Sequence, residues 1–472
     1  MKALKSLHRF AFILAVLSAT PTLPVAAQTF TVLHTFTNSP DGDPRNGGLL
    51  LSGNVIYGTS GAGGAYGDGT VFRINSDGTG LTNLHSFTAQ TNLINSDGAF
   101  PVAALALSGN VLYGTTVYGG TGGNGTVFRL NTDGTGFTNL HYFTTTVSNT
   151  NSDGSQPGSA LIISGNTLFG TASEGGSLGK GTIFALNTDG TGFTNLYNFG
   201  TTPSDGYLPQ SSLVISSNVL YGTAAKGGSS YTSGGIIFSI NTNGTGYKIL
   251  YNFVTIEFPT SLILSGSTLY GSAEGGQFVG QDGSVYSFNL TNSVFTSLHD
   301  FTGPDGDQPY SLILAGNTLY GTTVTGYNTN RGIIFSINTD GTGLKTLHAF
   351  STTSGTKSTN SDGAFPSPQL VYLGNTLYGM ATQGGLYGDG TLFSLSLPIV
   401  APQLTITSTG ANVVLTWPTN ATGFTLEFAS NIVSQSVWST NAIAPVIINQ
   451  QNVVTNSISG KQMFYRLSQP PP

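Results

Sequence analysis

Aspartates recur along this sequence with a spacing that could bring several carboxylates to one place. Six of them begin an Asp-Gly pair whose glycine is followed within three residues by proline: Asp41, Asp97, Asp153, Asp205, Asp305 and Asp362. Carboxylate oxygens are preferred Ca²⁺ ligands, so a calcium site is one interpretation of the set. Asp-Gly before proline is also common turn chemistry, and each aspartate belongs to a separate repeat. The pattern therefore favours turns without a cofactor over a shared Ca²⁺ site.

Histidine recurs two residues before a phenylalanine, and tyrosine takes its place twice. The histidines are His34, His85, His141, His299 and His348, and the tyrosines are Tyr197 and Tyr251. A general base or a metal ligand must converge with its partners on one point. One residue in each of several repeats cannot do so, and the pattern indicates a repeated packing or edge position.

A third set of candidates stands directly before glycine in the loops of the repeat, where the residue type changes from copy to copy. Its members are Tyr118, Glu174, Lys226, Glu274 and Gln383. Glu174 and Glu274 could form the carboxylate pair of a glycoside hydrolase, which needs a separation of roughly 5–10 Å. Because they lie two repeats apart, nothing in the sequence sets that separation. Residues of this kind are also common in solvated loops that bind nothing. We predict that any ligand binds this set and that no residue is catalytic; a polysaccharide-active hydrolase or lyase that uses these acidic residues is the alternative.

The elements that carry these residues belong to a tandem repeat of four short strands. A Tyr-Gly or Phe-Gly pair recurs at Tyr57, Tyr113, Phe169, Tyr221, Tyr270, Tyr320 and Tyr378, 49 to 58 residues apart. Apolar runs, a Gly-Asn turn, a Gly-rich loop and an Asp-Gly-Thr-Gly turn separate the strands. Seven copies of a four-stranded unit of this length predict a seven-bladed β-propeller over residues 28–397.

The fourth strand is offset by one copy along the chain. One copy, Phe30 to Phe36, precedes the first repeat, and none follows the last third strand, Thr391 to Leu397. Seven complete units result only if the N-terminal strand joins the last one, which closes the ring without an unpaired edge. The long, varied loops then share one face, where binding residues usually lie.

The repeat stops at Pro398, and a different pattern follows a Pro-containing linker, residues 398–402. Residues 403–472 show alternating short strands with turn signals, which predict a small β-sandwich. Trp417 and Tyr465 are its expected core aromatics. The fold class is all-β throughout.

The unit LYGTTVYGG…GTVFRLNTDGTGFTNLHYF resembles the tandem repeat of the GloVer-type bacterial exported proteins and is similar in layout to kelch blades. The resemblance covers about residues 30–397 and implies no catalytic motif. Residues 403–472 resemble a fibronectin type III or immunoglobulin-like module. In the absence of a catalytic motif, we expect a non-catalytic binding or structural scaffold.

The first 27 residues have the pattern of an export signal. Lys2, Lys5 and Arg9 precede a short apolar core, and Val25-Ala26-Ala27 fits a cleavage site. We therefore expect a secreted or cell-surface protein with no membrane span in the mature chain.

The mature chain would hold 11 Lys and Arg against 20 Asp and Glu, a net charge of −9, and no cysteine. Nucleic acid needs clustered basic residues, so it is not an expected partner. We expect a monomer whose ligand is a glycan or a protein.

Overall fold

The computed structural model describes residues 28–202, 204–228, 234–253, 258–275, 282–326, 331–398, 403–409, 412–418, 424–430, 437–441, 443–448, 451–457 and 463–468. The predicted signal peptide and residues 399–402 of the predicted linker lie outside them. Within these residues the regular structure is all β, and no helix is present that could cross a membrane.

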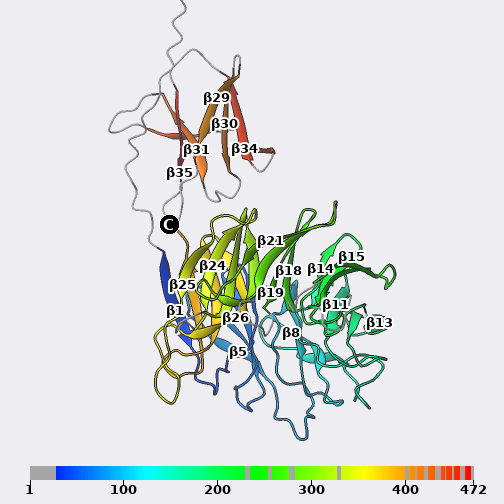
Figure 1. Cartoon of the computed structure of the whole chain (residues 1–472). Coiled ribbons are helices and arrows are strands. Elements are labelled where there is room, and N and C mark those ends of the chain that lie inside the picture. The colour runs from blue at the N-terminus through cyan, green and yellow to red at the C-terminus, as the bar shows by residue number, and fades with distance from the viewer. Residues whose placement is uncertain are drawn as a thin grey trace, which may run out of the picture.

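Seven four-stranded antiparallel sheets, consistent with propeller blades, occupy residues 29–396 (Figure 1). We number them by the order of their first strands. Sheets one to three consist of β2 (Leu49–Ser52), β3 (Val55–Ser60), β4 (Thr70–Asn75) and β5 (Thr82–Ser86); β6 (Ala106–Ser108), β7 (Val111–Thr116), β8 (Thr126–Asn131) and β9 (Thr138–Tyr142); and β10 (Ile162–Ser164), β11 (Thr167–Ala172), β12 (Thr182–Asn187) and β13 (Thr194–Asn198). Sheets four to six consist of β14 (Val214–Ser216), β15 (Val219–Ala224), β16 (Ile236–Asn241) and β17 (Lys248–Asn252); β18 (Phe258–Ser265), β19 (Thr268–Glu274), β20 (Ser284–Asn289) and β21 (Val294–Asp300); and β22 (Asp307–Ala315), β23 (Thr318–Thr325), β24 (Ile333–Asn338) and β25 (Lys345–Ala349).

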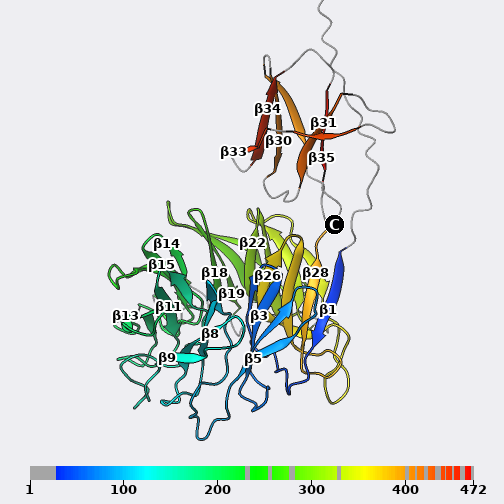
Figure 2. The same ribbon diagram turned by 180° about the vertical axis from the view of Figure 1, so that it is seen from behind.

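Sheet seven takes its strands from both ends of the repeat region. It consists of β26 (Ala364–Leu373), β27 (Thr376–Gln383), β28 (Thr391–Ser396) and β1 (Thr29–Thr35). Phe30 pairs with Leu395 and Val32 with Phe393, so the N-terminal strand is the fourth strand of the last sheet (Figure 2). This is the pairing that the offset of the repeat predicts.

A glycine of the second strand and an aromatic ring of the third face each other within every sheet. In sheet one Gly58 is the cross-strand partner of Phe72. A Cβ atom on Gly58 would stand 2.2 Å from the ring of Phe72, so only glycine lets the ring lie across the strand. This close approach explains why glycine recurs after tyrosine or phenylalanine in every repeat.

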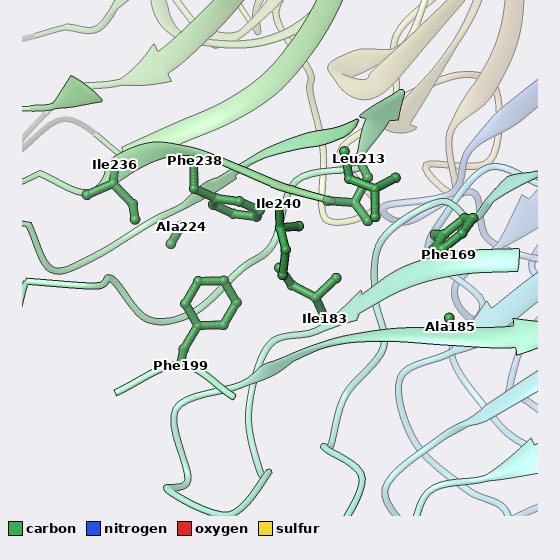
Figure 3. Close-up of a cluster of buried hydrophobic side chains, with 10 residues drawn as sticks. Phe169, Ile183, Ala185, Phe199, Leu213, Ala224, Ile236, Phe238 and Ile240 are labelled. Atoms are coloured by element: carbon green, nitrogen blue, oxygen red, sulfur yellow. The ribbon is translucent and has the colours of Figure 1, made fainter. Parts of the chain in front are cut away.

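Buried apolar clusters join each sheet to its neighbours. One of them combines Phe169, Ile183 and Phe199 of sheet three with Leu213 and Phe238 of sheet four (Figure 3). Equivalent clusters join the other consecutive sheets, and one joins the last sheet to the first. In that cluster Met380 and Leu392 of sheet seven pack with Ile56 and Phe72 of sheet one.

The remaining strands form two smaller antiparallel sheets, which Figure 1 shows as a separate group. They are β29 (Thr405–Thr409), β30 (Asn412–Pro418), β34 (Gln451–Ser457) and β33 (Val446–Ile448), and then β32 (Ser439–Thr440), β31 (Thr425–Ala429) and β35 (Phe464–Ser468). Leu415 and Trp417 of the first sheet share a buried cluster with Leu426 of the second, and Tyr465 packs against it. Both expected core aromatics therefore take part in this core.

Deleting residues 28–38 should destabilise the repeat region severely. The deletion leaves β28 as an unpaired edge and removes Phe36, which is fully buried between sheets seven and one. Each large apolar side chain is worth about 1.5–3 kcal/mol, and an open edge also promotes aggregation. The melting temperature of the purified deletion variant should fall by about 10 °C or more, because losses of this size lower the melting temperature by several degrees each. An unchanged melting temperature would show that this strand does not hold the last sheet.

Candidate functional site

The antiparallel order gives the repeat region two different edges. The turns between first and second and between third and fourth strands are short and share one edge, which we call the short-turn edge. The loops between second and third strands, and those that lead to the next sheet, share the other, the long-loop edge. The variable sequence positions lie on the long-loop edge.

The five predicted ligand-binding residues occupy equivalent positions there. Each stands at the end of a second strand or two residues beyond it, and pairs with a residue that follows the Asp-Gly position of the preceding loop. The pairs are Ala99 with Tyr118, Ser155 with Glu174, Tyr207 with Lys226, Phe258 with Glu274 and Ala364 with Gln383. Ala62 and Thr325 fill the same position in sheets one and six. The set is thus one residue per sheet rather than one cluster.

A cavity of about 540 Å³ lies where the first strands of the sheets converge. Its volume is within the range of small-molecule sites. Small and polar residues of the first strands and of the turns before them make up most of its wall, among them Gly48, Ala104, Ser159, Ser212 and Thr260. Longer polar side chains enter the wall at Asn46, Gln210, Tyr310 and Gln369.

Two of the five predicted binding residues, Lys226 and Glu274, line this cavity. The other three lie outside its wall. Tyr118 packs edge-on against Phe100, with ring centroids 5.5 Å apart, and Glu174 accepts a hydrogen bond of 2.9 Å from Gln156 Nε2. Gln383 is exposed. Glu174 and Glu274 are therefore not a pair within one site.

The electrostatics of the cavity centre on Glu274, which is half-buried. Burial raises the pKa of its carboxyl group, and the charge of Asp307 raises it further. Burial also raises the pKa of Tyr310 to about 12, with a contribution from the Glu274 carboxylate. Asp307 itself accepts a hydrogen bond of 2.8 Å from Thr325 Oγ1. Among the described wall residues Glu274 is the one carboxylate and Lys226 the one amine.

Hydrogen bonds hold the aspartates of the Asp-Gly motifs in place within the repeat region. His85 Nε2 lies 3.0 Å from Asp97 Oδ2, and the backbone N–H of Thr88 donates to the same carboxylate. The same His–Asp contact joins His34 to Asp41, His141 to Asp153, His299 to Asp305 and His348 to Asp362. In sheet three Tyr197 replaces histidine, and its hydroxyl donates to Asp205 at 2.8 Å. The Asp-Gly motif thus anchors each loop to the strand before it.

The recurring histidines also connect one sheet to the next. The ring of His85 stacks on Phe137 of the following repeat at 3.8 Å, and that of His141 stacks on Phe193 in the same way. These contacts explain the packing position that the sequence predicts for the histidines. The described residues contain no group of three or more His, Asp or Glu that could hold a metal ion. The Ca²⁺ interpretation therefore gains no support, since each aspartate is engaged within its own loop.

The sequence analysis missed two features of the site. It treated the histidines and the Asp-Gly aspartates separately, although both are missing together between sheets four and five, where Tyr251 and Glu257 stand at those positions. That joint change was the available signal. The four polar wall residues Asn46, Gln210, Tyr310 and Gln369 were also not predicted. Their residue types differ between repeats, so no periodic signal identifies them.

These features define an all-β repeat protein of β-propeller-like architecture with a central cavity. The chain belongs to the Gloeobacter/Verrucomicrobia repeat family, whose model matches the overlapping stretches 20–150, 91–278, 142–317 and 258–413. No curated protein matches the sequence.

Two solved structures that match this chain have little sequence identity to it. The GH74 xyloglucanase from Xanthomonas campestris matches 83% of this chain and 59% of its own, with 13% identity and a TM-score of 0.52. The oligogalacturonate lyase from Vibrio parahaemolyticus matches 78% of this chain and 93% of its own, with 11% identity and a TM-score of 0.49. At such identities the xyloglucanase match supports the fold alone. The chain spans less than two thirds of that enzyme.

Because the Asp-Gly aspartates accept hydrogen bonds in the folded protein, we expect the protein to lose stability in acid. Burial raises the pKa of Asp97, but the hydrogen bonds from His85 and Thr88 outweigh it and leave the pKa below its ordinary value. Asp41, Asp305 and Asp362 show the same direction. A carboxyl group whose pKa is lower in the folded state stabilises the protein above its unfolded pKa, about 4, and this stabilisation is lost as the pH falls through the folded pKa. The free energy of unfolding, measured with urea, should therefore decrease below about pH 4.

The variant Asp97→Asn isolates one of these contributions. It should lower the free energy of unfolding at pH 7 by about 1–3 kcal/mol and should weaken its dependence on pH between 5 and 2.5. An equal loss of stability in acid for the variant and the unaltered protein would contradict the assignment.

Proposed function

We propose that this chain is an exported, non-catalytic binding scaffold that holds a glycan in its central cavity. The observation that carries the proposal is the composition of the cavity wall. Strands from different sheets supply hydroxyl, amide and backbone groups around a volume of about 540 Å³. Such groups match the hydroxyls of a sugar, and a rigid scaffold presents them without a large loss of conformational entropy on binding.

The scaffold of this proposal is a closed seven-bladed propeller. The pairing of β1 with β28 and the apolar cluster shared by sheets seven and one support closure. The signal-like residues 1–27 support export to the cell surface or the medium. The low charge and the Asn, Ser and Thr content fit a protein that works outside the cell.

The C-terminal residues 403–472 are proposed to be a separate β-sandwich of fibronectin type III or immunoglobulin-like kind. Their own buried cluster, around Trp417, supports independence from the repeats. A chain ending at Pro398 should then remain soluble and unfold in one cooperative transition, with a melting temperature within about 3 °C of the repeat transition in the full chain. Aggregation or loss of cooperativity in the shortened chain would show that the repeats depend on the C-terminal residues.

A polysaccharide-active enzyme is the second candidate. The favouring observation is that Glu274 and Asp307 influence each other while only Glu274 lines the cavity. Glycoside hydrolases usually use two carboxyl groups in different environments for catalysis. Asp307 is engaged by Thr325, however, and the described wall offers no second carboxylate, so binding without hydrolysis remains our proposal.

The binding proposal predicts which substitutions affect a glycan. Neutral and charged oligosaccharides would be screened against the full-length protein by calorimetry or ligand-observed NMR. For any binder, Gln210→Ala combined with Gln369→Ala should weaken affinity about tenfold, because two amide groups of the wall are lost. Asn110→Asp on the short-turn edge serves as the control and should have no effect.

Loss of binding in the Asn110→Asp control alone would overturn the placement of the site. Cleavage of the oligosaccharide, detected by chromatography and abolished by Glu274→Gln, would establish the enzyme instead. Failure of every oligosaccharide to bind would contradict the glycan proposal.

A further inference from the structure

Glu274 differs from the six Asp-Gly aspartates of the long-loop edge because its carboxylate has no partner among the described residues. It stands at the end of β19, half-buried, in the cavity wall. Within the described part of the chain its carboxylate enters no hydrogen bond and no ion pair, whereas the six Asp-Gly aspartates are all engaged. A half-buried carboxylate is costly to desolvate unless a donor or a cation faces it. Among the described residues, the cavity thus holds a carboxylate acceptor that has no protein donor.

Two aromatic residues share the wall with this carboxylate. Phe258 is the cross-strand partner of Glu274 in sheet five, and residues paired in this way have their Cβ atoms about 5 Å apart. Tyr310 of sheet six lines the same cavity. The faces of aromatic rings attract ammonium groups, and a carboxylate beside them adds a full opposite charge.

The charges around Glu274 have one predominant sign. Asp307 lies on the adjacent β22 and interacts with Glu274, and Asp282 in turn interacts with Asp307. Lys226 is the opposing charge; it is exposed, belongs to sheet four, and forms no ion pair with Glu274. The wall residues of sheets five and six therefore include one carboxylate, Glu274, and no amine, and a cation bound there would offset the repulsion between Glu274 and Asp307.

We propose that the cavity binds an amino sugar whose free ammonium group contacts Glu274 beside the rings of Phe258 and Tyr310. This inference rests on the proposed glycan-binding function and narrows its ligand class to saccharides with an unacetylated amine. Lys226 then lies near the hydroxyl-bearing part of the ligand. Neutral and acidic saccharides bind less tightly at this site.

The test uses two saccharides that differ in the amine alone. Isothermal titration at pH 6 and 150 mM salt would compare the tetrasaccharide of β-linked glucosamine with the tetrasaccharide of N-acetylglucosamine, on the full-length protein. We expect the glucosamine tetramer to bind at least about tenfold more tightly, because it alone carries the ammonium group. Glu274→Gln should abolish this preference, so that the affinities of the two tetramers differ by less than about twofold.

The matched control removes one carboxylate of the opposite edge. Asp340→Asn leaves an Asn-Gly-Thr-Gly turn, which the chain already has at Asn243, so its fold is preserved. The preference for the amine should be unchanged in this variant, since a general attraction to the negative protein is screened at this salt concentration.

Each alternative result overturns the inference in a recognisable way. Equal affinity for the two tetramers would refute the amine preference but leave glycan binding in place. A preference that survives Glu274→Gln, or that Asp340→Asn removes equally, would refute the role of Glu274. Failure of both tetramers, when another oligosaccharide binds, would refute the ligand class; failure of every saccharide would refute the proposed function as well.

Discussion

The contact between a second-strand glycine and a third-strand aromatic ring is the constraint on which this structure depends. In all seven sheets a Cβ atom on the glycine would meet the ring at 2.5 Å or less: Gly58 with Phe72, Gly114 with Phe128, Gly170 with Phe184, Gly222 with Phe238, Gly271 with Tyr286, Gly321 with Phe335 and Gly379 with Phe393. Each of these rings also meets, edge to face, an aromatic ring at the end of the preceding sheet, with centroids 5.2–5.6 Å apart.

The series of edge-to-face contacts runs through every sheet and includes the contact of Phe36 in the N-terminal segment with Phe72 of sheet one. Aromatic pairs of this geometry contribute about 0.5–1.5 kcal/mol each beyond their buried area. The cost of glycine in a strand is offset because the ring covers the strand in its place. One local device, repeated in each sheet, therefore fixes both the interior of the sheets and their order.

A scaffold held together in this way leaves the long-loop edge free to differ between repeats. The His–Asp contacts anchor the loops to their strands, and the contact of His299 with Asp305 does so in the loop that precedes Tyr310. The short-turn edge is uniform by comparison: Asp77 accepts hydrogen bonds from Thr79 within its own turn, as do the equivalent aspartates. In the proposed function, selectivity for a ligand would therefore depend on the long-loop edge and the cavity.

Most of the scaffold could be predicted from the sequence, because a contact repeated seven times leaves a repeated residue pattern. Tyr57-Gly58 and Phe72 are visible in this way, and the offset of Phe30 to Phe36 predicted its pairing with β28. The cavity could be predicted only in part. Lys226 and Glu274 were identified as loop residues that vary, but their convergence with Gln210 and Tyr310 depends on the curvature of the whole repeat region, which no local pattern encodes. The His–Asp contact was hidden for a related reason, since the partners are separated by 7 residues at His34 and by 14 at His348.

The most direct test of the account is a crystal structure of the full-length protein soaked with an oligosaccharide that it binds. The account predicts density for a sugar ring inside the central cavity, with a polar atom of the ligand within hydrogen-bond distance of Glu274. Density confined to the Gly-Asn and Asp-Gly-Thr-Gly turns, or to the strands after residue 403, would contradict it, since the ligand would then be recognised by surfaces that the account treats as purely structural.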